Sequence, residues 1–324
     1  MKPLRSRRSE NKSHPGFITR TLRLAAALAV TTRAPFLPAS ILPVVIGALL
    51  ARQITGRFDA GLLLWTLFGV TAVHLSANVA NDYFDYRSGN DAVNKDYIRP
   101  FTGGSRTVLD GRISPAGLLA FALAWLGLSF IPAVYIAATV SPWILVPAGI
   151  AVLIGWLYSA PPAQLSARGL GEPAVALDFA VLPVFCSYWI QAGEPAWRPV
   201  TVSLPLAALI SAVLVVNQLP DYQADAAVGK RNWVVRLGKR RGSILYAALV
   251  AAWMPLLLPA ISTIGTTAGI IICLVFAPVA FAAAVIVIRR NSEPRKLAPA
   301  CALTAFLHSG VAASICAALI IQRI

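Results

Sequence analysis

Residues 81–91 read Asn-Asp-Tyr-Phe-Asp-Tyr-Arg-Ser-Gly-Asn-Asp and close a long apolar run. Asp82, Asp85 and Asp91 therefore place three carboxylates at the end of a segment long enough to cross a membrane. Charges at such a position are expensive unless something cationic binds them. A second acidic stretch, residues 221–225, closes another apolar run with Asp221 and Asp225. The sequence predicts a scaffold that brings these two stretches, the first and second motifs, face to face.

The composition indicates an integral membrane protein. The chain is 57% hydrophobic and 13% charged, whereas a soluble domain carries about 25% charged residues. The net charge of +15 would suit a nucleic-acid partner, but the basic residues fall in the gaps between apolar runs. We therefore expect membrane lipid as the surroundings and no nucleic acid as a partner.

Nine apolar runs approach the roughly 20 residues that a spanning helix needs. They predict an all-α integral membrane fold of nine transmembrane helices around a central cavity. A basic cytoplasmic tail is expected over 1–32 and a transmembrane domain over 33–324. The second and sixth runs each end in a motif, then a basic loop, then two further runs, which suggests two four-helix pseudo-repeats plus one helix. The runs are 34–51, 61–81, 116–138, 142–158, 173–191, 201–219, 244–260, 266–288 and 297–321.

The basic residues predict the orientation. With the N-terminus inside, all of the 28 Lys and Arg except Arg52, Arg57, Arg198 and Arg323 fall in cytoplasmic segments. Cytoplasmic loops carry such an excess of positive charge. We expect a multi-pass protein of the cell inner (plasma) membrane, with the N-terminus and the active-site loops in the cytoplasm.

The two motifs offer hard oxygen ligands. On a helix, the first motif continues a polar stripe that begins at His74 and Asn78, and Asn217, Asp221 and Asp225 follow at spacings of four. Oxygen ligands without Cys or His partners favour Mg²⁺ or Ca²⁺ over zinc, and Mg²⁺ completes its shell with water and phosphate oxygens. The plain alternative is that these acids are solvated and paired with nearby Arg and Lys. The predicted metal ligands are Asn81, Asp82, Asp85, Asp91, Asp221 and Asp225.

A basic loop follows each motif. After the first motif, Gly103 and Gly104 would let backbone N–H groups approach phosphate oxygens. The chain has no Walker-type loop, so a nucleotide site is not indicated. The basic residues would alternatively do no more than mark the cytoplasmic side. The candidates for binding a diphosphate are Lys95, Arg99, Arg106, Lys230 and Arg231.

At these residues the chain resembles the UbiA-type intramembrane aromatic prenyltransferases. That family carries Asn-Asp-x-x-Asp-x-x-x-Asp after its second helix and Asp-x-x-x-Asp after its sixth. The second motif matches, whereas Gly89 stands where the first motif's third acid is expected and Asp91 follows two residues later. The branch that prenylates 1,4-dihydroxy-2-naphthoate in menaquinone synthesis is the most similar. Features shared with that branch are residues 33–38, 158–162 and 221–238.

The resemblance implies a reaction. Mg²⁺ held by the catalytic residues Asp82, Asp85, Asp221 and Asp225 would bind a polyprenyl diphosphate and stabilise the leaving diphosphate. An electron-rich aromatic acceptor would then attack the allylic cation, and with dihydroxynaphthoate CO₂ would be lost. The other acceptors left open are 4-hydroxybenzoate, homogentisate, a glycerol-phosphate lipid and a tetrapyrrole.

Four further residues are candidates for binding the acceptor: Arg33, Tyr158, Asp178 and Asn217. Arg33 would meet an acceptor carboxylate, or alternatively anchor the cytoplasmic side. Asp178 lies within an apolar run, where a charge is unusual, and would bind the acceptor or pair with Arg168. A rival function from another class is a cation-coupled transporter, which predicts acids near the membrane midplane on broken helices.

Overall fold

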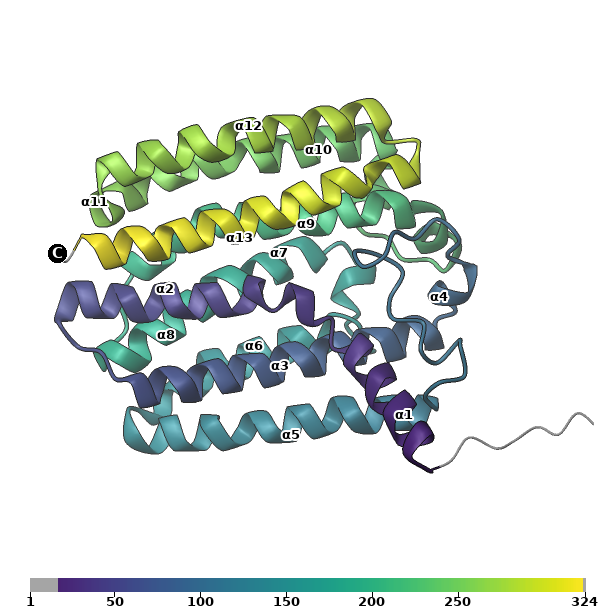
Figure 1. Cartoon of the computed structure of the whole chain (residues 1–324), viewed down its shortest axis with the longest axis horizontal. Coiled ribbons are helices and arrows are strands. Elements are labelled where there is room, and N and C mark those ends of the chain that lie inside the picture. The colour runs from purple at the N-terminus through teal and green to yellow at the C-terminus, as the bar shows by residue number, and fades with distance from the viewer. Residues whose placement is uncertain (1–16, 323–324) are drawn as a thin grey trace, which may run out of the picture.

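The computed structural model describes residues 17–322, which fold as helices joined by loops and turns. Figure 1 shows the long helices lying side by side, with the loops around α4 at one end of the bundle. We call this end the motif end, because α3 and α9 finish there. The α-helices are α1 (Phe17–Thr31), α2 (Pro38–Thr55), α3 (Ala60–Arg87), α4 (Asn90–Val93), α5 (Pro115–Thr139), α6 (Leu145–Leu157), α7 (Gly171–Ala176), α8 (Leu182–Ala192), α9 (Arg198–Ala227), α10 (Trp233–Leu257), α11 (Ile261–Ile264), α12 (Thr266–Arg290) and α13 (Ala298–Ile321).

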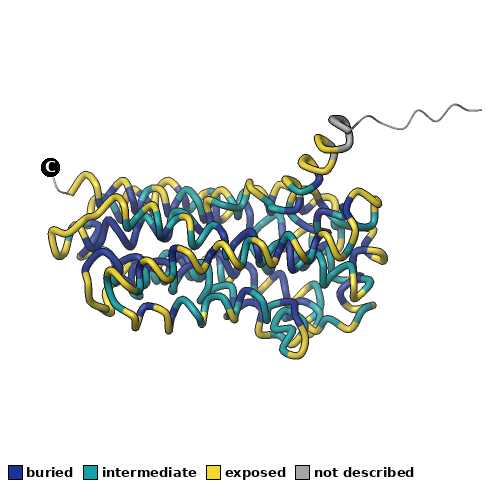
Figure 2. Tube along the Cα trace, turned by 90° about the horizontal axis from the view of Figure 1, so that it is seen from below, coloured by how far each residue is buried: buried dark blue, intermediate teal, exposed yellow. Residues whose placement is uncertain are grey.

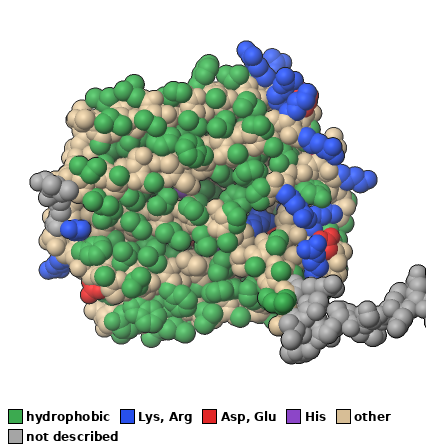
Figure 3. All heavy atoms as spheres, viewed as in Figure 1, with side chains coloured by type: hydrophobic (Ala, Val, Ile, Leu, Met, Phe, Trp, Pro, Cys, Tyr) green, Lys and Arg blue, Asp and Glu red, His purple; other side chains and the backbone are tan. Residues whose placement is uncertain are grey.

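Eight of the described helical segments are long and apolar enough to cross a membrane. They match eight of the nine expected spans, and the all-α membrane fold is confirmed. The expected span 142–158 is a 3₁₀ turn followed by the 13-residue helix α6, a shorter apolar helix of the same bundle. Exposed side chains on the outer surface are mostly apolar, and Lys and Arg gather toward the motif end (Figure 3).

Helix α9 is the centre of the fold. In its most apolar stretch 67% of the residues are buried, whereas the figure for α5 is 22%. The difference arises because α7, α10 and α13 all pack against α9. The largest hydrophobic core joins α2, α9, α10, α12 and α13, and Figure 2 shows exposed positions along the outer faces of the bundle. The second motif thus sits at the end of the best-packed helix, whereas the first motif ends α3, which packs mainly on α5.

Two parts of the chain differ from a simple bundle of continuous helices. Between α7 and α8, residues Leu177–Val181 form a π-helical segment, η4, within the span Gly171–Ala192. Helix α10 is interrupted at Gly238, whose φ of 79° and ψ of 158° break the helix. The expected tail over 1–32 contains helix α1, and its residues 1–16 lie outside the described part of the chain.

Helices α2 and α8 approach closely at Gly47. A Cβ at this position would lie 2.8 Å from Ser187 Cβ and 2.9 Å from the backbone nitrogen of Tyr188, and it would also meet the Val184 carbonyl oxygen. Beside it, the Ser187 hydroxyl donates a hydrogen bond to the Val44 carbonyl over 2.6 Å. Close backbone approach through small residues, with hydrogen bonds between helices, is a common way for membrane helices to associate.

We expect Gly47→Ala to destabilise the folded protein by roughly 1–3 kcal/mol, because the methyl group must push α2 away from α8. The matched control is Gly127→Ala on α5, where a Cβ meets nothing within 4 Å. Thermal unfolding of the two variants in the same detergent tests this. Equal melting temperatures for the two variants would show that the α2–α8 contact is not tight.

Candidate active site

A cavity of about 230 Å³, the main cavity, lies between the ends of α3 and α9. Along α9 its lining runs from Ile210 through Leu214 and Asn217 to Asp221 and Asp225. Because a helix rises 1.5 Å per residue, this lining passes from apolar to acidic over roughly 20 Å. Along α9 the lining of the main cavity is therefore apolar toward the membrane interior and charged at the motif end.

The loop of the first motif holds the carboxylates of the second. The side-chain amide of Asn90, the first residue of α4, donates to Asp225 Oδ1 over 2.8 Å, and that of Asn94, directly after α4, donates to Asp221 Oδ1 over 2.7 Å. Asn232, at the start of α10, donates to Asp225 Oδ2 over 2.8 Å. These bonds satisfy oxygens of the buried Asp225 and the half-buried Asp221, and they hold α4 against the end of α9.

Lys230 joins the two motifs with one positive charge. Its Nζ lies 2.5 Å from Asp85 Oδ1 on α3 and 3.8 Å from Asp225 Oδ1 on α9. The side chain is only 17% exposed, and burial alone would lower the pKa of Lys230. Asp85 and Asp225 outweigh burial, so the pKa is raised and the ammonium stays charged. Carboxylates from both motifs thus share one cation.

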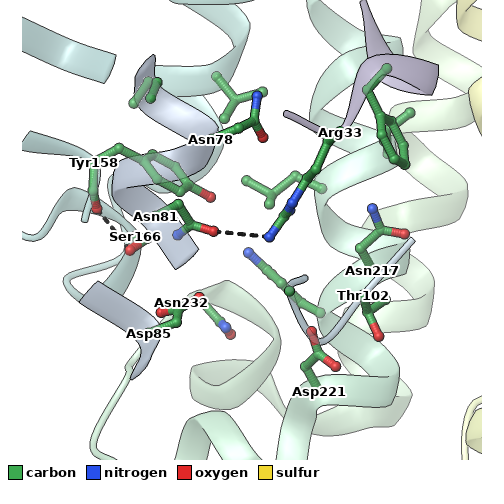
Figure 4. Close-up of a pocket in the computed structure, with 18 of the residues that line it drawn as sticks. Arg33, Asn78, Asn81, Asp85, Thr102, Tyr158, Ser166, Asn217, Asp221 and Asn232 are labelled. Carbon is green, nitrogen blue, oxygen red and sulfur yellow. Dashed lines mark hydrogen bonds between the residues drawn. The ribbon is translucent and has the colours of Figure 1, made fainter. Parts of the chain in front are cut away.

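Arg33 supplies a second cation from the turn before α2. Its Nη2 donates to Asp82 Oδ1 over 2.7 Å and to Asn81 Oδ1 over 3.4 Å, and it lines the main cavity (Figure 4). Burial opposes the charge, but Asp82 raises the pKa of Arg33. Arg33 adopts a left-handed backbone with φ of 48°, which is uncommon for a residue with a side chain.

Asp82 and Asp91 form a cradle around Gly104. A Cβ at Gly104, whose φ is +63°, would lie 3.1 Å from Asp82 Oδ1 and 3.2 Å from both oxygens of Asp91. Ser105 N donates to Asp82 Oδ2 over 3.1 Å, while Asp91 Oδ1 is buried with no partner in the described residues. Burial, together with the charges of Asp85 and Asp82, raises the pKa of Asp91 to about 8. This oxygen is poised for a cation.

The oxygen atoms of the two motifs fit a divalent ion that would also be bound by a highly charged anionic ligand. Within residues 17–322, no three His, Cys, Asp or Glu side chains lie close enough to form a complete metal cage. Mg²⁺ usually takes only one or two carboxylates and fills its shell with water and phosphate oxygens. The free oxygen of Asp91 and the glycine cradle agree with an ion that the protein and a bound ligand would hold together.

The other predicted diphosphate ligands lie away from the main cavity. Lys95 and Arg231 are exposed, and the Arg99 guanidinium lies 5.7 Å from the Tyr97 ring centre. Arg106 Nη1 donates to the Asp91 carbonyl over 2.6 Å, which shapes the loop. Only Lys230 of the five lines the main cavity, and the roles of the other four stay predictions.

The four predicted acceptor ligands all line the main cavity. Asp178 projects from the π-helical segment opposite Gly155, where a Cβ would lie 3.6 Å from Asp178 Oδ2. Its expected alternative partner, Arg168, instead donates to the Pro162 carbonyl over 2.8 Å. Figure 4 shows Tyr158 and Asn217 on opposite sides of the same cavity. Asn217 Oδ1 is buried without a hydrogen-bond partner among the described residues.

His74 lies on α3, about two turns before the first motif. Its Nδ1 forms a 2.7 Å hydrogen bond with the Ser40 hydroxyl, and its ring packs edge-on against Phe179. His74 therefore ties α2 to α3 in the wall of the main cavity.

Sequence reasoning missed Asn90, Asn94 and Glu172. The two asparagines are spaced by four, so a short helix would place both on one face, and that spacing was the available signal. Glu172 is buried in α7, where its Oε1 accepts from Gln218 Nε2 over 2.9 Å and from Trp233 N over 3.2 Å. It ties α7 to α9 and α10 beside the second motif, and no local pattern marked it.

Comparison with protein families gives one match over most of the chain. Residues 40–310 match the model of the UbiA prenyltransferase family. A 1,4-dihydroxy-2-naphthoate octaprenyltransferase of Bacillus subtilis is 28% identical over 220 residues, which cover 68% of each chain. The enzyme of the same name from Mycobacterium tuberculosis is 31% identical over 215 residues, covering 66% of this chain and 71% of its own.

Solved structures share the fold. A UbiA homologue from Aeropyrum pernix aligns with a TM-score of 0.67 at 15% identity, covering 89% of this chain and 98% of that one. A homologue from Archaeoglobus fulgidus bound to GPP and Mg²⁺ aligns with a TM-score of 0.58 at 18% identity, covering 92% and 99%. At these identities the likeness concerns the arrangement of helices.

Proposed function

The chain belongs to the UbiA prenyltransferase family, and from this premise we propose that it transfers a polyprenyl group from a polyprenyl diphosphate to 1,4-dihydroxy-2-naphthoate. The transfer would be Mg²⁺-dependent, would release CO₂ and would serve menaquinone biosynthesis. The observation that carries the proposal is the main cavity, which is apolar along α9 and ends where Lys230 joins both acidic motifs. Curated relatives with this activity support the choice of acceptor.

The acidic end of the cavity is proposed to hold the diphosphate. The residues that would hold Mg²⁺ are Asn81, Asp82, Asp85, Asp91, Asp221 and Asp225. When bound, Mg²⁺ would neutralise the negative charge that develops on the leaving diphosphate. Lys230 places a fixed positive charge at the same end, where it would lower the barrier to breaking the allylic C–O bond.

The apolar part of the cavity is proposed to hold the prenyl chain. Phe36, Ile210 and Leu214 line it and would exclude water, which would otherwise capture the allylic cation. A long apolar chain on the donor also explains why the site lies inside a membrane protein. The basic loops at the motif end favour a cytoplasmic location for this end in an inner (plasma) membrane.

The acceptor is proposed to bind between Arg33, Tyr158, Asp178 and Asn217. Arg33 reaches the cavity from the turn before α2 and would pair with the acceptor carboxylate, a strong charge-assisted contact. Asn217 Oδ1 has no hydrogen-bond partner in the described part of the chain, and Asp178 lines the same cavity, so both are proposed to meet the acceptor's hydroxyl groups. Placement between these groups would set which ring carbon faces the cation.

The proposed function is tested with purified protein, Mg²⁺, a labelled polyprenyl diphosphate and a panel of aromatic acids and other family acceptors, with products read by mass. We expect a prenylated product from dihydroxynaphthoate whose mass shows the loss of CO₂. If only 4-hydroxybenzoate or homogentisate gave a product, the protein would still be a prenyltransferase, but the proposed acceptor would be wrong.

We expect Arg33→Ala to raise the KM for the acceptor more than the KM for the prenyl diphosphate, by about tenfold or more, because a charge-assisted hydrogen bond contributes roughly 1.5–3 kcal/mol. Steady-state kinetics with each substrate varied in turn provide the measurement. Arg112→Ala is the matched control, since its exposed guanidinium pairs with Asp110 over 3.5 Å. Equal effects on the two KM values would argue that Arg33 serves the diphosphate through Asp82 instead.

A further inference from the structure

A second cavity of about 100 Å³, the outer cavity, lies beside the main cavity at the motif end. Asp85, Ser166 and Lys230 line both cavities. The ion pair between Lys230 and Asp85, 2.5 Å long, is therefore part of the partition between the two. Next to it, Asn81 of the main cavity donates to Ser159 of the outer cavity over 2.8 Å.

The outer cavity lies between the last turns of α3 and the segments that follow α6 and α9. Ser88 comes directly after α3 and Gly229 shortly after α9, and both are exposed. Ser159 is 7% exposed and lies deep in the lining. The cavity thus leads from exposed backbone at the end of the bundle inward to the wall of the main cavity.

Its lining suits a small anion. The Lys230 ammonium is the cation, and the Ser159 hydroxyl accepts from Asn81 and so keeps its own proton to donate. Within residues 17–322, the side-chain amide of Gln164 has no hydrogen-bond partner, although Gln164 lines this cavity. Among the described residues that line the outer cavity, Asp85 is the one acid, and it pairs with Lys230. A cation with two uncharged donors is a common way to bind phosphate oxygens.

The reaction proposed above creates a need for such a site. Prenyl transfer leaves inorganic diphosphate at the acidic end of the main cavity, and along α9 the lining beyond Asn217 is apolar, with Leu214, Val213 and Ile210. Moving a polyanion through apolar surroundings is very expensive, so the prenylated product and the diphosphate cannot share one exit. The partition at Lys230 and Asp85 is polar, and the outer cavity beyond it is also lined by the exposed residues Ser88 and Gly229.

We propose that the outer cavity is the exit site for inorganic diphosphate. The Lys230 ammonium, on its flexible four-carbon stem, exchanges its contact with Asp85 for one with the more highly charged diphosphate, while Asp225 stays beside it. This exchange opens the partition, and Gln164 and Ser159 then receive the anion on its way to the aqueous side. The inference rests on the proposed function, because it requires that diphosphate forms in the main cavity.

Two variants narrow the exit from positions that line the outer cavity alone, Ala167→Phe and Val228→Phe. The full-length protein is mixed with Mg²⁺ and ³²P-labelled inorganic diphosphate, and the association and dissociation rates are followed. We expect both rates to fall about tenfold in each variant while Kd stays within twofold of wild type, since a narrower passage hinders entry and departure equally. Leu237→Phe, at a 40% exposed surface position outside both linings, should behave as wild type.

Three outcomes would overturn the exit site. Unchanged rates in both variants would show that diphosphate leaves elsewhere. A weakened Kd in both would show that the outer cavity belongs to the binding site or to the fold. A wild-type protein that binds no diphosphate would remove the proposed function, and the exit site with it, whereas normal wild-type binding with unchanged variant rates removes the exit site alone.

Discussion

We expect Asp82→Ala and Asp221→Ala each to abolish Mg²⁺-dependent prenyl transfer, lowering kcat/KM by at least about a thousandfold. Removing one group that stabilises developing negative charge typically costs a hundredfold to a thousandfold, and each of these acids is proposed to contribute through the metal as well. Asp82 lies 2.7 Å from Arg33, and Asp221 accepts from Asn94 over 2.7 Å. Each substitution therefore removes a carboxylate from a different motif of one site.

The measurement is product formation with purified variants in detergent or reconstituted vesicles. Asp110→Ala is the matched control, because Asp110 is a 38% exposed acid of the same loop region whose one ion-pair partner among residues 17–322 is Arg112. All three variants should elute as wild type does on gel filtration. Wild-type turnover in either motif variant would remove that acid from the metal site.

The second large effect is expected at Lys230. Replacing it with methionine leaves Asp85 and Asp225 facing each other without the cation that lies 2.5 Å and 3.8 Å from them. Removing one partner of a buried ion pair costs roughly 3–5 kcal/mol in stability. We expect Lys230→Met to lower kcat/KM at least about a hundredfold, because it loses both the fixed charge on the diphosphate and the alignment of the two motifs.

Two comparison variants separate charge from shape at this position. Lys230→Arg keeps the charge and should recover part of the activity, whereas Lys239→Met removes a nearby cation that packs over the Tyr222 ring at 5.5 Å and should leave activity unchanged. Steady-state kinetics at several Mg²⁺ concentrations test this. If Lys230→Met remained fully active, the convergence of both motifs on one cation would have no part in catalysis.

Most of the architecture could be predicted from the sequence, because long apolar runs identify membrane spans without any knowledge of tertiary contacts. Span boundaries were less accurate: α3 was expected to end at residue 81 and continues to Arg87. The polar residues of the first motif continue the helix, but a prediction from hydropathy ends the span at the first of them. The expected span 142–158 is the short helix α6, since length rather than composition separates it from the others.

The acidic residues of the site were accessible to pattern reasoning because carboxylates at membrane-helix ends are rare. Which cations pair with them was not, because Arg33 and Lys230 reach Asp82 and Asp85 from distant parts of the chain. The docking of α4 on α9 by Asn90 and Asn94 depends equally on tertiary contacts. The family match argues against the alternative of a cation-coupled transporter. The position of the acids at helix ends agrees with this.

The central claim is that carboxylates of both motifs hold one diphosphate through divalent ions. Its most direct test is Mn²⁺ binding followed by electron paramagnetic resonance, with and without an uncleavable prenyl thiodiphosphate, in wild type, Asp82→Ala and Asp221→Ala. We predict that the thiodiphosphate strengthens Mn²⁺ binding in the wild type and that either substitution alone abolishes this gain. Wild-type coupling between Mn²⁺ and the thiodiphosphate in either variant would contradict the claim, because one motif would then be sufficient.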